Sequence, residues 1–286
     1  MSEAHPGGPP RQSAGGMNMR HGSAFTGIGG FDLGFAAAGI ETAWQIESSP
    51  FCRRVLKRRW PAAARYDDVR RVLRPGLYED GPTTVDVISG GDPCPIRSSA
   101  RLGRASRHPD LSGYFLALVG RLRPRWLVRE NVPAPDVVDF LAGLEALGYG
   151  TTLIEVNPVL LTGQDRRRQI AIGHSRSVAA RFRASLYFAS LDSEGVTRHN
   201  EISEAVSGTL VAHCNRMATE PGFCLEPGRG MRQFTVAERE RLAGFPGGWT
   251  AGLSRYRACH ALGNSFPPPL AEWIGRRIVE TEVGIP

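Results

Sequence analysis

The chain of 286 residues is long enough for one large domain, or for one domain that carries a small insert. With 41% hydrophobic and 22% charged residues it has the composition of a globular protein with a packed core, and no apolar run approaches the ~20 residues of a membrane span. Five cysteines without regular spacing argue against a disulfide framework and a metal site, whereas the net charge of +7 favours a polyanionic partner.

The first 20 residues are rich in Gly, Pro and Ser and lack the apolar core of a signal peptide. We therefore expect a disordered tail on a cytoplasmic, intracellular protein. From residue 21 to 174, short apolar runs alternate with amphipathic stretches, as in a parallel α/β sheet. The pattern predicts strands at residues 23–25, 42–46, 85–88 and 126–128, helices at 31–38, 50–60, 111–122 and 140–147, and a late hairpin from 151–156 and 169–172.

Beyond residue 174 the periodic pattern weakens, and residues 175–230 are interpreted as a small separate insert. A helix is then predicted at residues 235–243, because Thr235 with Glu238 three residues later forms a capping-box pattern. A last amphipathic helix is predicted at residues 270–280, directly after three prolines.

A glycine-rich turn, Phe25-Thr26-Gly27-Ile28-Gly29-Gly30, joins the first strand to the first helix. Glycines let the backbone approach a ligand closely, and a helix N-terminus presents unpaired N–H groups. Glu47 follows the next strand, about 20 residues on, where an acid can bind a ribose. The turn lacks the GKS or GKT sequence of a phosphate-binding loop, so an adenosine ligand without a polyphosphate is the better interpretation.

Cys94 comes directly after a predicted buried strand, in the sequence Gly91-Asp92-Pro93-Cys94. A lone cysteine is more often a small buried hydrophobe than a nucleophile. The next strand, however, ends in Glu130, and the ends of parallel strands lie side by side, so thiol and carboxyl share one edge. Residues 164–168 add alternating arginines, a run that by itself is more often a solvated surface.

Taken in order, these blocks resemble the cytosine carbon-5 DNA methyltransferase family. The resemblance is carried by six blocks: Phe25 to Gly30 resembles its FxGxGG signature, Pro93-Cys94 its catalytic Pro-Cys, Glu130-Asn131-Val132 its ENV, Gln164, Arg166 and Arg168 its QxRxR, residues 232–246 its helix ending in GFP, and Gly263-Asn264-Ser265 with the following prolines its closing GN[AS]-x-PPP motif. The blocks occur in family order and span nearly the whole chain after the tail.

The resemblance implies an α/β, Rossmann-like class I S-adenosylmethionine-dependent methyltransferase fold. Such a fold has a mostly parallel sheet with one antiparallel strand and helices on both faces. It also implies that residues 21–174 form the catalytic and cofactor-binding domain, that residues 175–230 form a small irregular target-recognition domain, and that residues 231–286 return to the catalytic domain. The implied partner is double-stranded DNA, the implied setting is restriction and modification, and by family analogy the protein is a monomer.

The resemblance also assigns roles to residues. Cys94 adds to carbon 6 of a flipped cytosine, Glu130 holds the ring nitrogen, and Arg168 with Arg166 grips the base. The cofactor, S-adenosyl-L-methionine, is implied to contact Phe25, Gly27, Ile28, Gly29, Gly30, Glu47 on the ribose, Asp68 near the adenine amine with Asp67 as its rival, Asn264 and Ser265. DNA contacts are implied for Ser98, Arg97, Arg101, Arg104 and Gln164, and no metal is implied.

One block departs from the family pattern. After Pro-Cys the family has Gln, any residue and then Phe-Ser, whereas this chain has Pro95-Ile96-Arg97-Ser98-Ser99. Because of this difference, two alternative functions stay open: the same chemistry on tRNA, or transfer of another one-carbon group to cytosine. A catalytically silent DNA-binding protein is a further alternative, although such a protein has no chemical reason to keep Cys94, Glu130 and Arg168 together.

Overall fold

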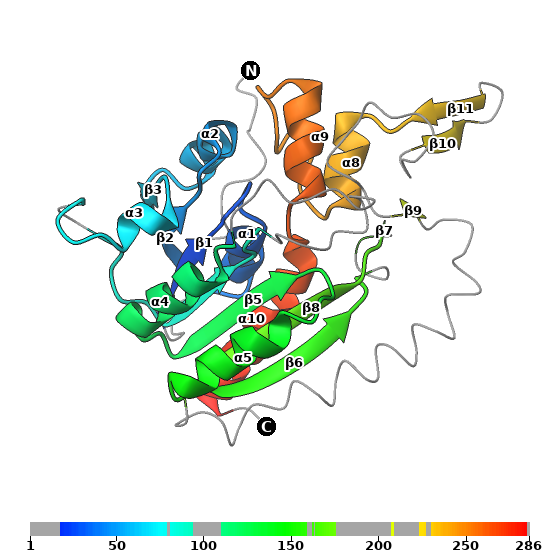
Figure 1. Ribbon diagram of the computed structural model, residues 1–286. Helices are drawn as coiled ribbons and strands as arrows, with labels where there is room; N and C mark the ends of the chain where they lie inside the picture. The colour runs from blue at the N-terminus through cyan, green and yellow to red at the C-terminus, as the bar shows by residue number, and fades with distance from the viewer. Residues whose placement is uncertain are drawn as a thin grey trace.

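A central seven-stranded sheet organises the protein in the computed structural model, which describes residues 18–78, 81–93, 110–158, 162, 164–175, 207–208, 223–226 and 230–284 (Figure 1). The strand order is β3-β2-β1-β4-β5-β8-β6, and β8 alone runs in the direction opposite to the other six strands of this sheet. The strands are β1 (Arg20–Ala24), β2 (Glu41–Ile46), β3 (Ala64–Tyr66), β4 (Val87–Gly90), β5 (Trp126–Asn131), β6 (Gly150–Val156) and β8 (Arg168–His174).

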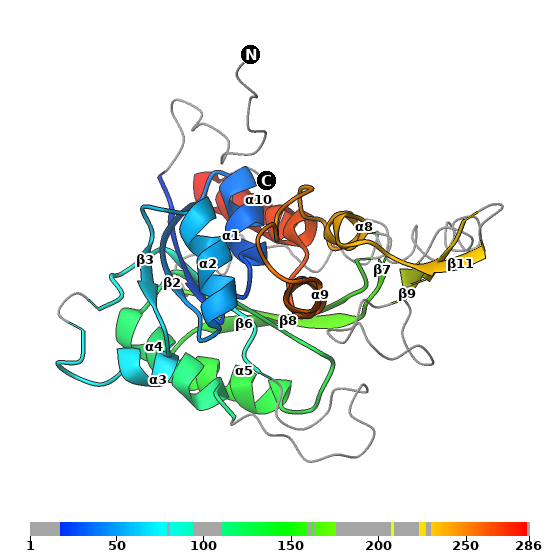
Figure 2. The same ribbon diagram turned by 90° about the horizontal axis from the view of Figure 1, so that it is seen from above.

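Helices cover both faces of the sheet (Figure 2). One face carries α1 (Gly30–Ala37) and α10 (Pro268–Val283), whose apolar side chains pack on Val87, Trp126 and Ile170. The other face carries α3 (Val69–Val72), α4 (Ser112–Leu122) and α5 (Val137–Ala146). A third apolar cluster joins Ile28 to α2 (Pro50–Arg59), α8 (Val236–Leu242) and α9 (Arg255–Gly263).

The predicted fold class is confirmed, including the single antiparallel strand, and β6 and β8 form the predicted antiparallel pair. The capping box of α8 is confirmed, because the Thr235 and Glu238 side chains each bond the other's backbone N–H. The predicted tail extends too far: Met19 is buried and Arg20 begins β1. Residues 1–17 and most of the predicted insert lie outside the described residues.

Some elements were not predicted. Helix α9 buries mostly small residues and so lacks a strong apolar stripe, and β3 is only three residues long. The short strands β7 (Gln164–Asp165) and β9 (Ser207–Gly208) pair in parallel, and β10 (Phe223–Glu226) pairs antiparallel with β11 (Gly230–Gln233). None of the helices in the described ranges is long and apolar enough to cross a membrane.

The C-terminal segment packs tightly against α1 because two glycines of that helix face Phe266 and the start of α10. A Cβ added at Gly34 would lie 2.3 Å from the Pro268 carbonyl oxygen, and one at Gly30 would lie 2.0 Å from the Phe266 carbonyl oxygen. Backbone cannot yield as a flexible side chain can. Glycine at these positions therefore fixes how closely the C-terminal segment approaches the N-terminal loop.

We predict that Gly34→Ala lowers the free energy of unfolding by about 1–3 kcal/mol, because the added methyl group forces α1 and α10 apart. Urea unfolding followed by circular dichroism measures the effect. The matched control is Gly113→Ala in α4, where a Cβ would meet nothing within 4 Å. That change should be neutral or stabilising by up to about 1 kcal/mol, and equal destabilisation of the two variants would contradict the packing argument.

A group of polar side chains is buried between α1 and the first strands. Asp32 is 0% exposed and accepts a 2.8 Å hydrogen bond from Gln45 Nε2, while its Oδ2 has no hydrogen-bond partner within the described ranges. His21 bonds Ser89 Oγ at 2.7 Å, and burial lowers the pKa of His21 to about 3. Burial raises the pKa of Asp32 to about 6, although the Gln45 hydrogen bond opposes the shift.

We predict that Asp32→Asn stabilises the protein above pH 6. Between pH values of about 4 and 6 the folded state binds a proton at Asp32 that the unfolded state releases, so wild-type stability falls as pH rises through this window. The Asn variant does not pay this cost, and its advantage should grow from near zero below pH 4 to at most about 3 kcal/mol above pH 6.

The measurement is urea unfolding between pH 3.5 and 7.5. Asp139→Asn, on the exposed side of α5, serves as the control. An advantage for the Asp32 variant that does not change with pH would refute the prediction.

Candidate active site

The carboxyl ends of β4 and β5 lie side by side at one edge of the sheet. Gly90 pairs with Arg129 in the parallel β4–β5 ladder, so the residues that follow Gly90 adjoin Glu130. The antiparallel β8 begins at the same edge, where Asn131 pairs with Gln169. Three sequence blocks that are far apart along the chain therefore converge here.

Glu130 and Arg168 form an ion pair at this edge, with 2.6 Å between Arg168 Nε and Glu130 Oε1. Their side chains are only 15% and 11% exposed, so water screens the pair weakly. Glu130 Oε2 lies 2.9 Å from the position that a Cβ on Gly91 would take. A side chain at position 91 would displace the carboxylate, so Gly91 lets Glu130 pack against the segment that leads to Cys94.

A second, fully buried ion pair holds that segment in place. Arg129 Nε and a terminal nitrogen of the same guanidinium bond the two Asp92 carboxylate oxygens at 2.5 and 2.8 Å. The guanidinium also lies 4.3 Å from the centre of the Phe140 ring. Although burial alone lowers the pKa of Arg129, Asp92 and the more exposed Asp136 hold that pKa above its usual value. Arg129 is therefore a fixed cation that anchors Asp92.

The buried Arg166 side chain faces the C-terminal segment. Its guanidinium donates to the carbonyl oxygens of Gly263 and Ser265 at 3.1 and 3.0 Å. Burial, with the nearby Arg168 charge, lowers the pKa of Arg166 to about 9. We expected Arg166 to grip the base, but both of its terminal nitrogens bond backbone, which is the geometry of a positioning residue.

The glycine-rich turn and Glu47 are joined directly. One Glu47 carboxylate oxygen accepts the Gly27 N–H at 2.6 Å and the other accepts the Ser49 N–H at 2.7 Å. Burial raises the pKa of Glu47. Phe25 takes the left-handed conformation at φ 53, which is uncommon for a bulky residue and often marks a functional turn. The turn and Glu47, which we expected to contact the same ligand, therefore lie side by side.

The closing segment reaches the same turn from the far end of the chain. Phe266 stacks on Phe31 at 4.1 Å between ring centres, next to the close approach at Gly30. Ser265 is buried and donates to the Leu262 carbonyl, whereas Asn264 is exposed and contacts His260. The structure thus brings the predicted C-terminal block to the glycine-rich turn.

Two residues that we expected to contact the cofactor, Ile28 and Asp68, are engaged in contacts within the protein. Ile28 is 0% exposed and its carbonyl accepts the Trp249 indole N–H at 2.9 Å, so this residue packs in the core beneath the turn. Asp68 caps α3 through the Arg70 N–H at 2.8 Å and pairs with the Arg70 guanidinium, which lowers the pKa of Asp68. Its rival Asp67 bonds Tyr78 and Arg71.

Several predicted site residues cannot be placed. Cys94 follows Pro93 in the chain but lies outside the described residues, as do Arg97, Ser98, Arg101 and Arg104. For Gln164 only the backbone, in β7, is described. The thiol and the DNA contacts therefore stay predictions.

The sequence analysis missed the Asp92–Arg129 pair. A signal was present, because Arg129 follows the apolar run Trp126-Leu127-Val128 at a strand position that points inward, and a buried cation needs an acid. Trp249, which bonds Ile28, gave no comparable signal. A lone tryptophan after a Gly-Gly pair predicts burial but names no partner.

The strand order, the single antiparallel strand and the helices on both faces define the Rossmann-like fold of S-adenosylmethionine-dependent methyltransferases. The sequence matches the profile of the C-5 cytosine-specific DNA methylase family over residues 19–201 and 166–280, so the chain belongs to that family.

Individual relatives agree with this assignment. The chain is 34% identical over 116 residues to the type II methyltransferase M.AquIA of Picosynechococcus, and 31% identical over 137 residues to M.HindV of Haemophilus influenzae. These alignments cover 38% and 45% of this chain, and it spans only 47% and 43% of the relatives' lengths. The solved structure of a Spodoptera frugiperda DNMT2 mutant shares the fold with a TM-score of 0.69 and 13% identity, over 91% of this chain and 99% of that one.

We predict that Asp92→Asn lowers the free energy of unfolding by about 3–5 kcal/mol, because it leaves the buried Arg129 charge without its carboxylate. Thermal and urea unfolding measure the loss. Asp136→Asn is the matched control: it removes a carboxylate from the same guanidinium, but at 3.2 Å and with 45% of the side chain exposed. The control should cost at most about 1 kcal/mol, and a comparable loss in both variants would contradict the assignment of Asp92 as the anchor.

Proposed function

We propose that this protein transfers a methyl group from S-adenosyl-L-methionine to carbon 5 of cytosine in double-stranded DNA, with Cys94 as the covalent nucleophile. The observation that carries the proposal is the Glu130–Arg168 pair at 2.6 Å, packed against Gly91 in the segment that leads to Cys94. A carboxylate and a guanidinium at this edge, together with the Cys94 thiol three residues after Gly91 in the chain, suit the three parts of the ring on which such a reaction depends.

Carbon 5 of cytosine is too weak a nucleophile to be methylated unaided. The Cys94 thiolate would add to carbon 6, which places electron density on carbon 5. Glu130 would hold a proton at the ring nitrogen N3, and Arg168 would donate to the O2 carbonyl as negative charge develops there. After carbon 5 has accepted the methyl group, loss of its proton to a base and departure of the thiolate from carbon 6 restore the aromatic ring. A cytosine must leave the base stack to reach these groups.

When bound, S-adenosyl-L-methionine supplies an electrophilic methyl group on a positively charged sulfur. The described residues fit such a group. Each Glu47 oxygen accepts one backbone N–H and keeps a lone pair for a ribose hydroxyl. Gly27, at φ 59, has no atom within 4 Å of where its Cβ would lie, so the turn leaves open space beside Glu47. We assign the turn, Glu47, Asn264 and Ser265 to the cofactor site, with Asp68 at the adenine end.

The remaining assignments belong to the same proposal. We expect residues 175–230 to read the target sequence, the basic segment with Arg97, Ser98, Arg101 and Arg104 to contact the DNA backbone, and Gln164 to contribute a DNA contact. We also expect a cytoplasmic monomer that acts as a modification enzyme. The type II methyltransferase names of its relatives support this role.

We predict that purified protein with S-adenosyl-L-methionine forms 5-methylcytosine in duplex DNA, and that Glu130→Gln lowers turnover by about 10²–10⁴-fold. Nucleoside mass spectrometry measures the product. Cys94→Ala should abolish it, and duplexes that contain 5-fluorocytosine should trap a covalent complex with wild type but not with Cys94→Ala.

Glu145→Gln, which removes an exposed carboxylate of α5, is the control and should keep full turnover. Parallel reactions with tRNA separate the DNA proposal from the RNA alternative. If the protein binds DNA but forms a covalent complex with neither DNA nor tRNA, it is a silent DNA-binding protein and the proposal is overturned.

A further inference from the structure

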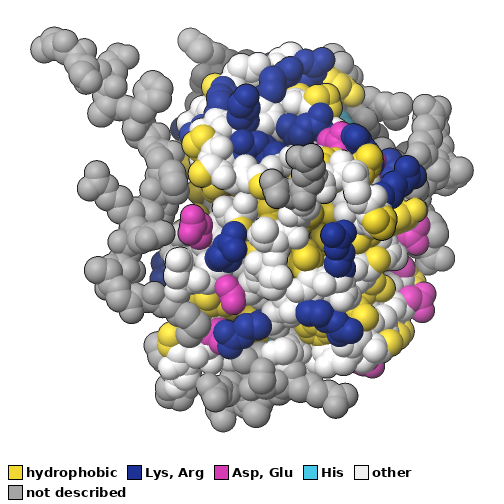
Figure 3. Space-filling view, turned by 90° about the vertical axis from the view of Figure 1, so that its left-hand side faces the viewer, with side chains coloured by type: hydrophobic (Ala, Val, Ile, Leu, Met, Phe, Trp, Pro, Cys, Tyr) yellow, Lys and Arg dark blue, Asp and Glu magenta, His cyan; other side chains and the backbone are white. Residues whose placement is uncertain are grey.

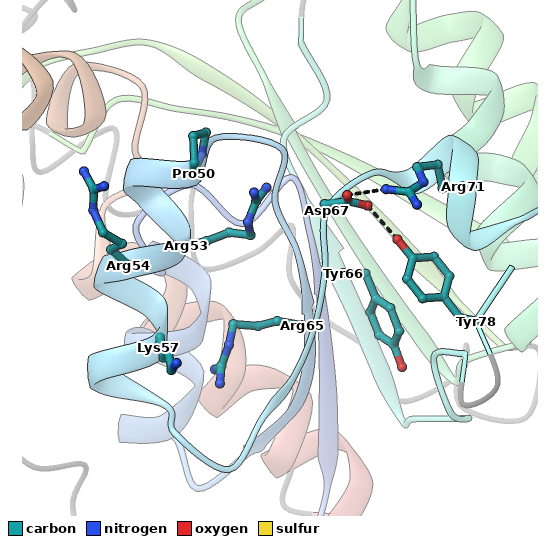
Figure 4. Close-up of a pocket in the computed structure, with 9 residues that line it drawn as sticks. All are labelled: Pro50, Arg53, Arg54, Lys57, Arg65, Tyr66, Asp67, Arg71 and Tyr78. Carbon is teal, nitrogen blue, oxygen red and sulfur yellow. Dashed lines mark hydrogen bonds and ion pairs between the residues drawn. The ribbon is translucent and has the colours of Figure 1, made fainter.

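A cationic hollow lies between α2 and β3, at the end of the sheet far from β8 (Figure 4). Its volume is about 580 Å³. Five of the nine lining residues are basic and one is acidic; the nine are Pro50, Arg53, Arg54, Lys57, Arg65, Tyr66, Asp67, Arg71 and Tyr78. We name the basic members, Arg53, Arg54, Lys57, Arg65 and Arg71, the α2–β3 basic face.

The segment that forms the hollow, residues 50–78, has the same net positive charge as the whole protein. Residues 50–78 contain nine basic and two acidic residues, a net charge of +7, and the complete chain also carries +7. Figure 3 shows Lys and Arg side chains gathered on the upper part of the corresponding surface. The excess of positive charge therefore comes from the segment that contains α2, β3 and α3.

Two cations of the basic face have no partner within the described ranges. Arg54 and Lys57 are exposed and make no hydrogen bond or ion pair there. By contrast, Arg53 donates to the Glu47 and Ser48 carbonyls, and Arg65 donates to the Trp60 carbonyl. Arg54 and Lys57 lie three residues apart on α2, so both project from the same helix face.

The helix itself does not explain this arrangement. Cations near a helix C-terminus are stabilised by the macrodipole, which accounts for Lys57 in the last turn of α2. Arg54 lies in the N-terminal half and gains nothing from that effect. Repulsion between neighbouring unpaired cations is unfavourable unless an anion is bound.

The cofactor is not a suitable occupant, because S-adenosyl-L-methionine has a net positive charge at neutral pH. The shape of the basic face also indicates which kind of anion it binds, a small anion or a charged polymer. The unpartnered cations are exposed and are spread along a helix, whereas a small anion is usually held in a cradle of buried donors. An extended polyanion with regularly spaced charges matches this pattern.

We propose that the α2–β3 basic face binds the phosphate backbone of duplex DNA that flanks the target cytosine, outside the catalytic edge. The identity of the polyanion rests on the proposed function. In the strand order, β3 lies four strands from β5, which carries Glu130, a separation of about 19 Å at ~4.8 Å per strand. Because one DNA strand rises about 3.4 Å per nucleotide, the contact needs about six base pairs beyond the target.

The chain contains a single lysine, Lys57, and this permits a direct footprint. The protein is treated with N-hydroxysuccinimidyl acetate alone, with a duplex of about 8 base pairs centred on cytosine, or with one of about 30 base pairs, and acetylation of Lys57 is measured by mass spectrometry. The long duplex should slow acetylation at least threefold and the short duplex should not. Equal rates with both duplexes overturn the proposal, and so does equal protection by inorganic phosphate, which would indicate a small-anion site.

The variant Arg54→Gln with Lys57→Gln provides a second test. Its affinity for the long duplex should depend less on salt, with a log–log slope smaller by about 1.8, or about 0.9 for each lost phosphate contact. Its slope on the short duplex and its turnover there should be unchanged. Arg276→Gln, which removes an exposed cation of α10, is the control and should leave the long-duplex slope unaltered. An unaltered slope in the double variant overturns the proposal.

Failure of this inference can be told apart from failure of the proposed function. Methylation of the short duplex by wild type tests the chemistry alone, because that duplex does not reach the basic face. Long duplexes with the target cytosine near one end or the other then show which flank is bound. Only one of the two orientations should protect Lys57, and protection by neither overturns the proposal.

Discussion

A guanidinium that is removed from water needs a carboxylate beside it to balance its charge. The chain meets this constraint at the edge of the sheet where β4, β5 and β8 come together. Arg129 has 2% of its side chain exposed and spans from β5 to the Asp92 carboxylate in the segment that follows β4. Because Arg129 lies on β5 and Asp92 lies two residues beyond the end of the neighbouring strand β4, the pair also holds the residues next to both of them. Glu130 directly follows Arg129, so the buried pair fixes the position of the proposed catalytic carboxylate, and it also anchors the segment that leads on to Cys94.

The same logic extends to the other end of the chain. Arg166, just before β8, holds the Gly263 and Ser265 carbonyls, and the glycines of α1 let Phe266 and Pro268 approach closely. The C-terminal helix thereby completes the face of the sheet on which α1 packs. The proposed catalytic edge and the proposed cofactor turn are thus tied together through backbone carbonyl groups, which restrict movement more than side-chain contacts do.

Charge is divided between two roles. Within the sheet edge, Arg129, Arg166 and Arg168 are each bonded to acids or carbonyls, and they organise the site. On α2, Arg54 and Lys57 are exposed, so they are available to a partner. A net charge counted from composition cannot separate these roles, because the difference lies in burial and pairing.

The sequence by itself determined the class of fold and the order of the motifs. Apolar runs, glycine turns and the Thr235–Glu238 cap depend on residues close together in the chain, so local physics is enough to predict them. That the glycine-rich turn and Glu47 lie close together follows from the same kind of pattern, because parallel strand ends meet at one edge. Only the tertiary structure decided which arginine pairs with Glu130, that Arg166 faces backbone, and that Asp92 anchors Arg129. These choices depend on side-chain reach between segments that are tens of residues apart, and no local pattern encodes such distances.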